Sequence, residues 1–237
     1  MAKDVIIACD FPGAKETFRF LDLFTQEKPF LKIGMELFYA EGPSIVKEIK
    51  RRGHRIFLDL KLHDIPNTVG HSVASVTRLG VNLITVHAGG GRAMMQAAAR
   101  YAKITADELG VERPKILAVT VLTSFDDQGW QEVGGHLPIE EHVLDLAKLA
   151  KDSGVDGVVA SPKEASFIRK AAGDDFLICT PGIRPSFAQT DDQKRIATPS
   201  QAFKNGSSVL VIGRPITQAV DPCAAARLIL KEIKENA

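Results

Sequence analysis

Short β-rich segments alternate with amphipathic helical segments along the whole 237-residue chain, and this alternation predicts an α/β fold of the (β/α)8 TIM-barrel class. The β-rich segments are continuous apolar runs, which is typical of parallel strands covered by helices. Eight such units agree with the about 250 residues that this barrel usually takes. A doubly wound open sheet is the structural alternative. We expect a single barrel domain over residues 1–237, without a linker.

The predicted strands are apolar runs of four to seven residues, bounded by polar or turn-forming stretches. In chain order they occupy Val5–Cys9, Phe30–Ile33, Arg55–Leu60, Leu83–His87, Ile116–Leu122, Gly157–Ala160, Phe176–Cys179 and Val209–Ile212. Between them, apolar residues recur at the spacing of an amphipathic helix. This spacing is clear at Ala14, Phe18, Leu21 and Phe24, and again at Ala225, Ile229 and Ile233.

Composition and charge exclude several classes of function. Thirty basic and 29 acidic residues give a net charge of +1 without a basic run, so nucleic acid is not an expected partner. No apolar stretch reaches the about 18 residues of a membrane span, and the start MAKDVIIACD lacks the layout of a signal peptide. We therefore expect a cytoplasmic protein. Its cysteines, Cys9, Cys179 and Cys223, have no metal-type spacing and are predicted to be buried thiols.

The segment FLDLKLHDIPNT, residues 57–68, carries Asp59, Lys61 and Asp64 at the end of an apolar run. Because alternate side chains of a strand share a face, Asp59 and Lys61 are expected to point the same way, with Asp64 following where the strand ends. Charges packed this closely perturb one another's pKa values and concentrate at catalytic sites. A structural ion pair at a strand end is the alternative reading.

Polar groups follow every predicted strand. In a barrel these ends meet on one face, where active sites are built. The residues concerned are Asp10, Lys32, Asp59, Lys61, His87, Thr123, Ser161, Arg184 and Arg214. Their convergence from eight separate segments predicts a polar site at the carboxyl ends of the strands.

Two of these ends predict a phosphate site. TPGIRP follows the seventh strand and carries Arg184, while VIGRPIT carries Gly213 and Arg214 at the end of the eighth. A glycine lets the backbone approach an anion, and arginine adds a forked cationic donor. HAGGGRAM after the fourth strand is a weaker candidate, since close packing also explains its glycines. The long polar stretch 182–197, with Gln193 near its end, predicts a lid over a phosphorylated ligand.

Together these motifs resemble the orotidine 5′-phosphate decarboxylase family in its bacterial form, over nearly the full length. The matching strings are IACD at Asp10, LKIGMELF at Lys32, DLKLHDIPNT from Asp59 to Thr68, VTVLTS at Thr123, PGIRP at Arg184, DQKR at Gln193, and VIGRPIT at Gly213 and Arg214. The resemblance implies conversion of orotidine 5′-phosphate to UMP and CO2 in de novo pyrimidine biosynthesis. It also implies a homodimer that uses no metal and no organic cofactor.

The resemblance further implies a role for each matching residue. Lys61 is the implied proton donor, in an alternating network with Lys32, Asp59 and Asp64. Asp64 and Thr68 are expected to enter the site from the partner subunit of the homodimer. The implied substrate contacts are Asp10 and Lys32 at the ribose, Asp59 at the departing carboxylate, Thr123 and Gln193 at the pyrimidine and closing loop, and Arg184, Gly213 and Arg214 at the 5′-phosphate.

The chemistry of such a decarboxylation agrees with this residue set. Loss of CO2 from C6 of the pyrimidine leaves electron density on a carbon with no adjacent carbonyl to accept it. A fixed ammonium can stabilise that density, and preorganised charge of this kind is usually the largest catalytic contribution. Lys61 can then protonate the carbon as a general acid.

Two other functions share parts of the pattern. A sugar-phosphate barrel enzyme of the keto-gulonate phosphate decarboxylase and hexulose phosphate synthase type has a similar Asp-x-Lys-x-x-Asp core but uses Mg²⁺. Lys32 and Lys61, with PGIRP and DQKR, favour the nucleotide enzyme. A phosphate-ligand sensor on the same barrel is the non-catalytic alternative, and it would need only the phosphate-binding residues.

Overall fold

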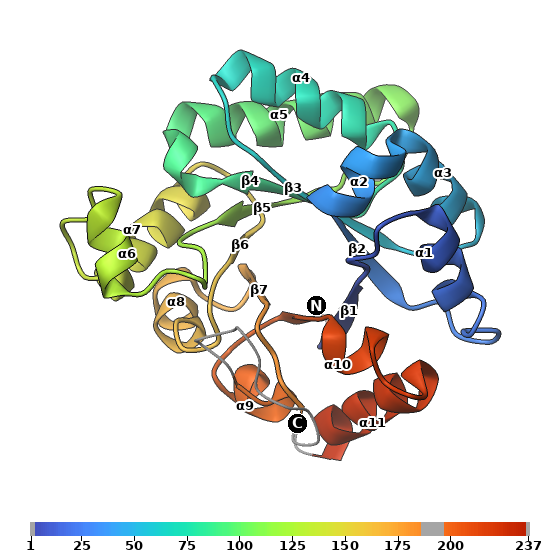
Figure 1. The fold of residues 1–237 in the computed structure, drawn as a ribbon. Helices are drawn as coiled ribbons and strands as arrows, with labels where there is room; N and C mark the ends of the chain where they lie inside the picture. The colour runs from blue at the N-terminus through green and yellow to red at the C-terminus, as the bar shows by residue number, and fades with distance from the viewer. Residues whose placement is uncertain (1–2, 186–196, 236–237) are drawn as a thin grey trace.

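The computed structural model of the chain describes residues 3–185 and 197–235. Within them, eight parallel strands close into a barrel in sequential order, and helices form the outer layer (Figure 1). The first strand pairs with the second on one side and with the eighth on the other, which closes the ring. The predicted barrel is therefore confirmed, and the open sheet is excluded.

The elements alternate along the chain as the sequence predicts. The strands are β1 Asp4–Ala8, β2 Phe30–Gly34, β3 Ile56–Leu62, β4 Leu83–His87, β5 Lys115–Val119, β6 Gly157–Val159, β7 Leu177–Thr180 and β8 Val209–Ile212. The helices are α1 Ala14–Leu21, α2 Met35–Glu41, α3 Pro43–Arg51, α4 Pro66–Thr77, the 3-10 turn η1 Ala88–Gly90, α5 Gly91–Leu109, α6 Asp127–Glu132, α7 Ile139–Asp152, α8 Ala165–Ala172, α9 Pro199–Lys204, α10 Arg214–Thr217 and α11 Pro222–Glu235.

The strands bury both of their faces. Alternate residues such as Ile6 and Phe57 belong to an apolar cluster inside the barrel, while Ile7 and Leu58 belong to the larger cluster between strands and helices. Burial on both faces is the reason that the strands are continuous apolar runs in the sequence. Cys9 and Cys179 are fully buried as predicted, whereas Cys223 is partly exposed.

One strand departs from regular geometry beside the charged residues. Leu58 of β3 pairs with Ile84 of β4, and Leu62 pairs with Val86, so a step of four residues on β3 faces a step of two on β4. Lys61 lies within this irregularity at φ +52°, the only non-glycine residue with positive φ in the described ranges. Bulges of this kind redirect side chains and are common beside active sites.

The carboxyl ends of two strands, β5 and β3, differ from the predicted ones by more than one residue, and the remaining strand bounds agree with the predictions or differ by one residue. β5 ends at Val119 and not at Leu122, because both neighbouring strands end at the residues that pair with Val119, which are His87 of β4 and Val159 of β6. β3 continues beyond the predicted end, because its ladder with β4 resumes at Leu62.

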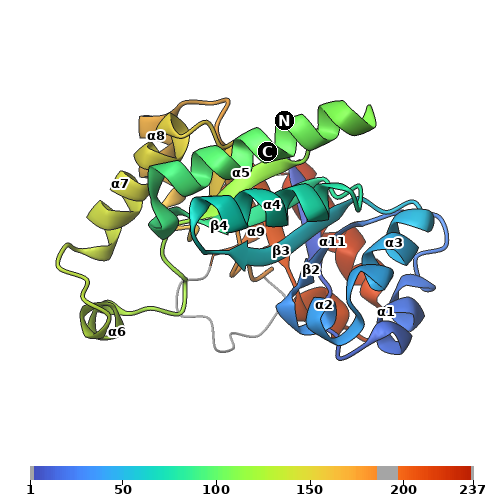
Figure 2. The ribbon, with the colours of Figure 1, turned by 90° about the horizontal axis from the view of Figure 1, so that it is seen from above.

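The helical layer is uneven around the barrel. α4 and α5 lie side by side along the strands, whereas α6 stands apart from the barrel in both views (Figure 1, Figure 2). The segment that carries α6 follows β5 and Thr123, so it begins at the carboxyl end of the strands. No helix in the described part of the chain is long and apolar enough to cross a membrane.

Candidate active site

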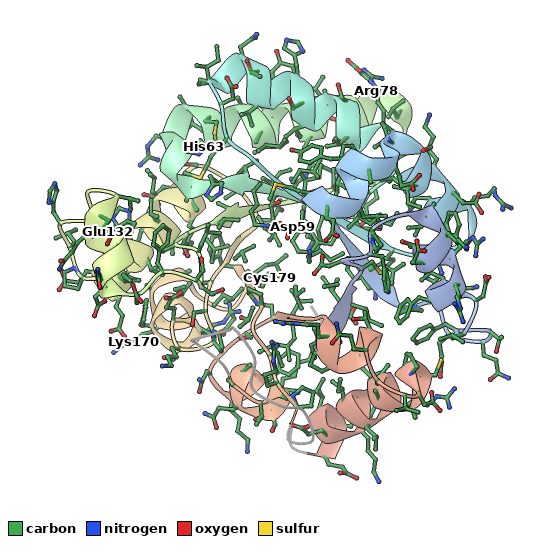
Figure 3. The ribbon with its side chains drawn as sticks, viewed as in Figure 1. Asp59, His63, Arg78, Glu132, Lys170 and Cys179 are labelled. Atoms are coloured by element: carbon green, nitrogen blue, oxygen red, sulfur yellow. The ribbon has the colours of Figure 1, made fainter. Side chains whose placement is uncertain are left out.

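Four charged side chains form a continuous chain of contacts at the carboxyl ends of the first three strands. Lys61 Nζ lies 2.9 Å from Asp59 Oδ2, and Lys32 Nζ lies 3.5 Å from the same oxygen. Lys32 Nζ also lies 3.1 Å from Asp10 Oδ1. Figure 3 shows Asp59 within the ring of strands. The predicted clustering of Asp10, Lys32, Asp59 and Lys61 is therefore present within one chain.

Burial strengthens the contacts around Asp59, whereas Asp10 is exposed. Asp59 is only 8% exposed, and burial alone would raise its pKa, but the charges of Lys32 and Lys61 lower the pKa by more. Burial would likewise lower the pKa of Lys32, but Asp59 and then Asp10 raise it. Both groups are therefore held in their charged forms.

A threonine that sequence reasoning missed completes the surroundings of Asp59. The Thr85 hydroxyl of β4 donates to Asp59 Oδ1 over 2.9 Å and accepts the backbone N–H of Lys61, also over 2.9 Å. Its signal in the sequence is a hydroxyl in the middle of an otherwise apolar run, LITVH.

A glycine that was also missed gives the lysine room. An added Cβ at Gly34 would lie 3.0 Å from Lys32 Nζ and 3.3 Å from Asp10 Oδ1. Gly34, which directly follows the predicted second strand, thus leaves space for the ion pair between Lys32 and Asp10.

The chain of contacts between these charged side chains borders a cavity of about 180 Å³. Lys32, Asp59 and Lys61 form its charged side, and Thr123 adds a hydroxyl after β5. The remaining wall is apolar and comes from Phe57, Val119, Val121, Leu122, Val159, Ala160, Pro181 and Val211. Charges that face an apolar, water-poor wall act more strongly than they would in water.

Asp64 and Thr68 lie outside this chain of contacts. Asp64 is exposed in the loop after β3, and its Oδ1 accepts the backbone N–H of Ile65 over 2.6 Å. Thr68 is exposed in the first turns of α4. No ion pair joins Asp64 to Lys61 or Lys32 among the described residues.

The predicted phosphate residues follow neighbouring strands. β7 and β8 pair through Cys179 with Val209 and through Thr180 with Leu210, so Arg184 follows one of two neighbouring strands and Gly213 with Arg214 follows the other. Arg184 is buried, and its backbone N–H donates to the Ala197 carbonyl over 2.9 Å. Gln193 and most of the predicted lid lie outside the described residues.

The other strand-end residues take different parts. His87 is half-buried with its ring 5.3 Å from that of His63, and burial, followed by the charges of His63 and Lys61, lowers its pKa. Ser161 is fully buried, and its amide donates to Glu164 Oε2 over 2.8 Å. It shapes the turn before α8 and does not line the cavity. Within residues 3–185 and 197–235, no three His, Cys, Asp or Glu side chains gather as metal ligands.

A closed parallel barrel with ionised groups gathered at the carboxyl ends of its strands defines the class of barrel proteins whose active sites lie at that end. The chain belongs to the orotidine 5′-phosphate decarboxylase / HUMPS family, whose sequence model matches residues 3–229.

Individual relatives resemble the chain over almost its whole length. The orotidine 5′-phosphate decarboxylase of Pelobacter propionicus is 49% identical over 231 residues, which cover 98% of this chain and 95% of the relative. The orotidine 5′-phosphate decarboxylase of Lactiplantibacillus plantarum is 51% identical over 237 residues, which cover 98% of this chain and 99% of the relative. The crystal structure of orotidine 5′-phosphate decarboxylase from Lactobacillus acidophilus superposes with a TM-score of 0.88 at 44% identity, covering 97% of this chain and 98% of that one.

Proposed function

We propose that the protein decarboxylates orotidine 5′-phosphate to UMP and CO2 in pyrimidine biosynthesis. The observation that carries the proposal is the chain of contacts from Lys61 through Asp59 and Lys32 to Asp10, which places fixed ammonium groups beside a partly apolar cavity. Relatives with this activity in their names, at 49% and 51% identity, support it.

The reaction needs a positive charge where the bond to the carboxylate breaks. As CO2 leaves, the bonding electron pair remains on C6, and the Lys61 ammonium beside it stabilises the carbanion-like transition state. Lys61 then gives one proton to C6, which yields UMP and a neutral amine. Uptake of one proton from solvent restores the ammonium, so the balance is substrate and one proton to UMP and CO2.

Asp59 fixes the ammonium before the reaction. Its Oδ2 is shared by Lys61 and Lys32, so Lys61 is held by a contact that exists without substrate. A positioned charge needs no reorganisation when the electron density develops, and this is the source of its effect on the rate. Asp59 also lines the cavity, where it faces the carboxylate that departs.

Remote contacts supply the binding energy that orients the substrate. Asp10 and Lys32 bind the ribose, and Thr123 and Gln193 the pyrimidine and its closing loop. Arg184, Gly213 and Arg214 hold the 5′-phosphate. Support comes from the places of the last three residues after the neighbouring strands β7 and β8, where barrels often bind phosphate.

The proposed unit is a cytoplasmic homodimer. Asp64 and Thr68 enter the site of the partner subunit, where Asp64 becomes the second carboxylate beside Lys61. Their exposure in the single chain supports this, as does the neighbouring Ile65, an apolar side chain that is 66% exposed. An interface would cover such a residue.

The proposed reaction uses neither metal nor organic cofactor. Asp59 Oδ2 already faces two ammonium groups, and its Oδ1 accepts the Thr85 hydroxyl. A Mg²⁺ ion at this carboxylate would have to displace these partners and approach two cations, which disfavours the sugar-phosphate alternative.

Loss of orotidine 5′-phosphate absorbance, measured with purified protein in excess EDTA, tests the proposal. We expect full turnover under these conditions. Turnover that EDTA abolishes and Mg²⁺ restores would favour the sugar-phosphate enzyme. Binding of UMP without any decarboxylation would favour the sensor.

A further inference from the structure

Thr85 is the only polar side chain in the middle of β4, and it is fully buried. It lies between Ile84 and Val86, the two residues of β4 that pair with β3 on either side of the irregular stretch. Thr85 therefore stands opposite Asp59–Lys61, where the regular ladder is interrupted. It does not line the cavity, whereas Asp59 and Lys61 do.

The hydrogen bonds of Thr85 have a fixed direction. The Lys61 N–H can only donate, so the Thr85 oxygen accepts it over 2.9 Å. Asp59 is ionised and can only accept, so the single hydroxyl proton goes to its Oδ1, also over 2.9 Å. One hydroxyl thus ties the backbone of the lysine to the carboxylate that holds its ammonium.

These two hydrogen bonds hold the backbone of Lys61 and the carboxylate of Asp59. Lys61 has φ +52°, which is uncommon for a residue with a side chain and persists only when the surroundings enforce it. Thr85 supplies the acceptor that the interrupted ladder does not. By occupying Asp59 Oδ1, it also leaves Oδ2 turned toward Lys61 and Lys32.

We propose that Thr85 is a positioning residue for the decarboxylation: its hydroxyl fixes the left-handed backbone of Lys61 and the rotation of the Asp59 carboxylate. This inference rests on the proposed function. Thr85 acts through Lys61 and Asp59, which lie at the reacting carbon, and not through the residues that bind the phosphate. Loss of its hydroxyl should therefore lower kcat more than it weakens nucleotide binding.

Thr85→Val tests the inference, since valine keeps the shape and removes the hydroxyl. We expect kcat to fall by about 10- to 100-fold while the Kd for UMP changes by less than about threefold. Thr85→Ser restores the hydroxyl and should recover most of kcat. Hydrogen exchange at the Lys61 amide should become faster in Thr85→Val, because its acceptor is gone.

Thr77→Val is the matched control. Thr77 is also buried, but its hydroxyl donates only within α4, to the Val73 carbonyl over 2.8 Å. This variant should keep both kcat and the exchange rate of Lys61. Circular dichroism and thermal unfolding of all three variants show whether each is folded.

The outcomes separate this inference from the proposed function. An unchanged kcat in Thr85→Val, or equal losses in Thr85→Ser and Thr85→Val, would overturn the positioning role. Equal losses of kcat and UMP affinity would show a general structural role instead. If the wild-type protein does not decarboxylate orotidine 5′-phosphate, the function fails, and unchanged exchange at Lys61 in Thr85→Val would then reject the Thr85 contact independently.

Discussion

Lys32 and Lys61 share a single oxygen atom, Oδ2 of Asp59, at 3.5 and 2.9 Å. Lys32 has a second carboxylate partner in Asp10, so it remains paired whichever neighbour is removed. Each lysine also keeps Asp59 neutralised when the other is absent. The two cations can therefore be deleted separately without leaving an isolated buried charge, which makes their roles accessible to mutation.

Lys61→Ala should abolish decarboxylation while UMP still binds. We expect a loss of at least about 10³-fold in kcat, because both the stabilising charge and the proton are removed. Titration with UMP should give an affinity within about tenfold of wild type. Lys50→Ala is the control and should keep full activity. Lys50 lies in α3 and lines, with Asn82 and Lys115, a cavity at the opposite end of the strands. A parallel loss of UMP binding in Lys61→Ala would contradict this division of roles.

Arg214→Ala should weaken binding through the phosphate. Loss of a charge-assisted hydrogen bond predicts a rise in KM of about 10- to 100-fold for orotidine 5′-phosphate. Orotidine, which lacks the phosphate, serves as the matched substrate, and its slower turnover should be nearly unaffected. Equal losses for both substrates would move Arg214 out of the phosphate site.

Two inactive variants should restore each other's activity. In a mixed dimer of Lys61→Ala and Asp64→Ala, one site draws both intact residues and the other draws neither. Random mixing of subunits after co-refolding should give about a quarter of wild-type activity, if the sites act independently.

A control pair distinguishes complementation from simple refolding. Lys61 and Asp59 are in contact within one chain, so mixing Lys61→Ala with Asp59→Ala leaves a lesion in every site and should recover nothing. Failure of the first pair to recover activity would place Asp64 in the site of its own chain.

The free energy of unfolding should fall below neutral pH, partly through His54. This side chain is 2% exposed, and its Nδ1 lies 3.0 Å from the Pro29 carbonyl. Burial, helped by the charges of Lys28 and Arg52, lowers its pKa below 6.5 in the folded state. Protons therefore bind more readily to the unfolded chain, and stability is lost as the pH falls from 6.5 through the lower folded pKa.

Urea unfolding of wild type and His54→Asn between about pH 8 and about pH 5 measures this contribution. Asparagine can keep a donor to the Pro29 carbonyl but does not titrate. Its stability should fall less steeply, with a difference in slope of at most about 1.4 kcal/mol per pH unit. Above pH 7 the two curves should run parallel. Identical slopes throughout would show that His54 titrates alike in both states.

Gly157→Ala should destabilise the barrel. An added Cβ would overlap the Leu177 carbonyl oxygen of β7 and lie 2.5 Å from the Leu177 Cβ, so the backbone of a paired strand would have to move. We expect a loss of about 1 to 3 kcal/mol in chemical unfolding. Gly89→Ala is the control, since nothing lies within 4 Å of its added Cβ. Equal stability of the two variants would show that β6 and β7 separate easily.

The sequence predicted the architecture because each strand is buried on both faces. Runs such as VLVI at Val209–Ile212 are recognisable without tertiary information. The expectation that Asp59 and Lys61 meet was confirmed, but its reason was incomplete. Simple alternation suggested the contact, whereas the structure makes it through an irregular ladder and a left-handed lysine.

What the sequence could not predict depends on pairing between strands. The importance of Thr85 arises from the β3–β4 register, and register is a relation between segments 26 residues apart. Ser161 shows the opposite case: its position after a strand suggested the site, but its amide is used by Glu164 in a local turn. The roles of Asp64 and Thr68 depend on a second subunit and remain predictions.

The closure of the ring by β1 and β8 has a consequence for how the activity arises during folding. Asp10 follows the first strand to be synthesised and Arg214 follows the last, and only the pairing of β1 with β8 makes these ends neighbours. The charged contacts come from the first three strands and the proposed phosphate residues follow the last two, so neither half of the barrel contains the complete proposed site. Catalysis should therefore appear late and all at once during refolding, so that turnover reports on ring closure more directly than helix content does.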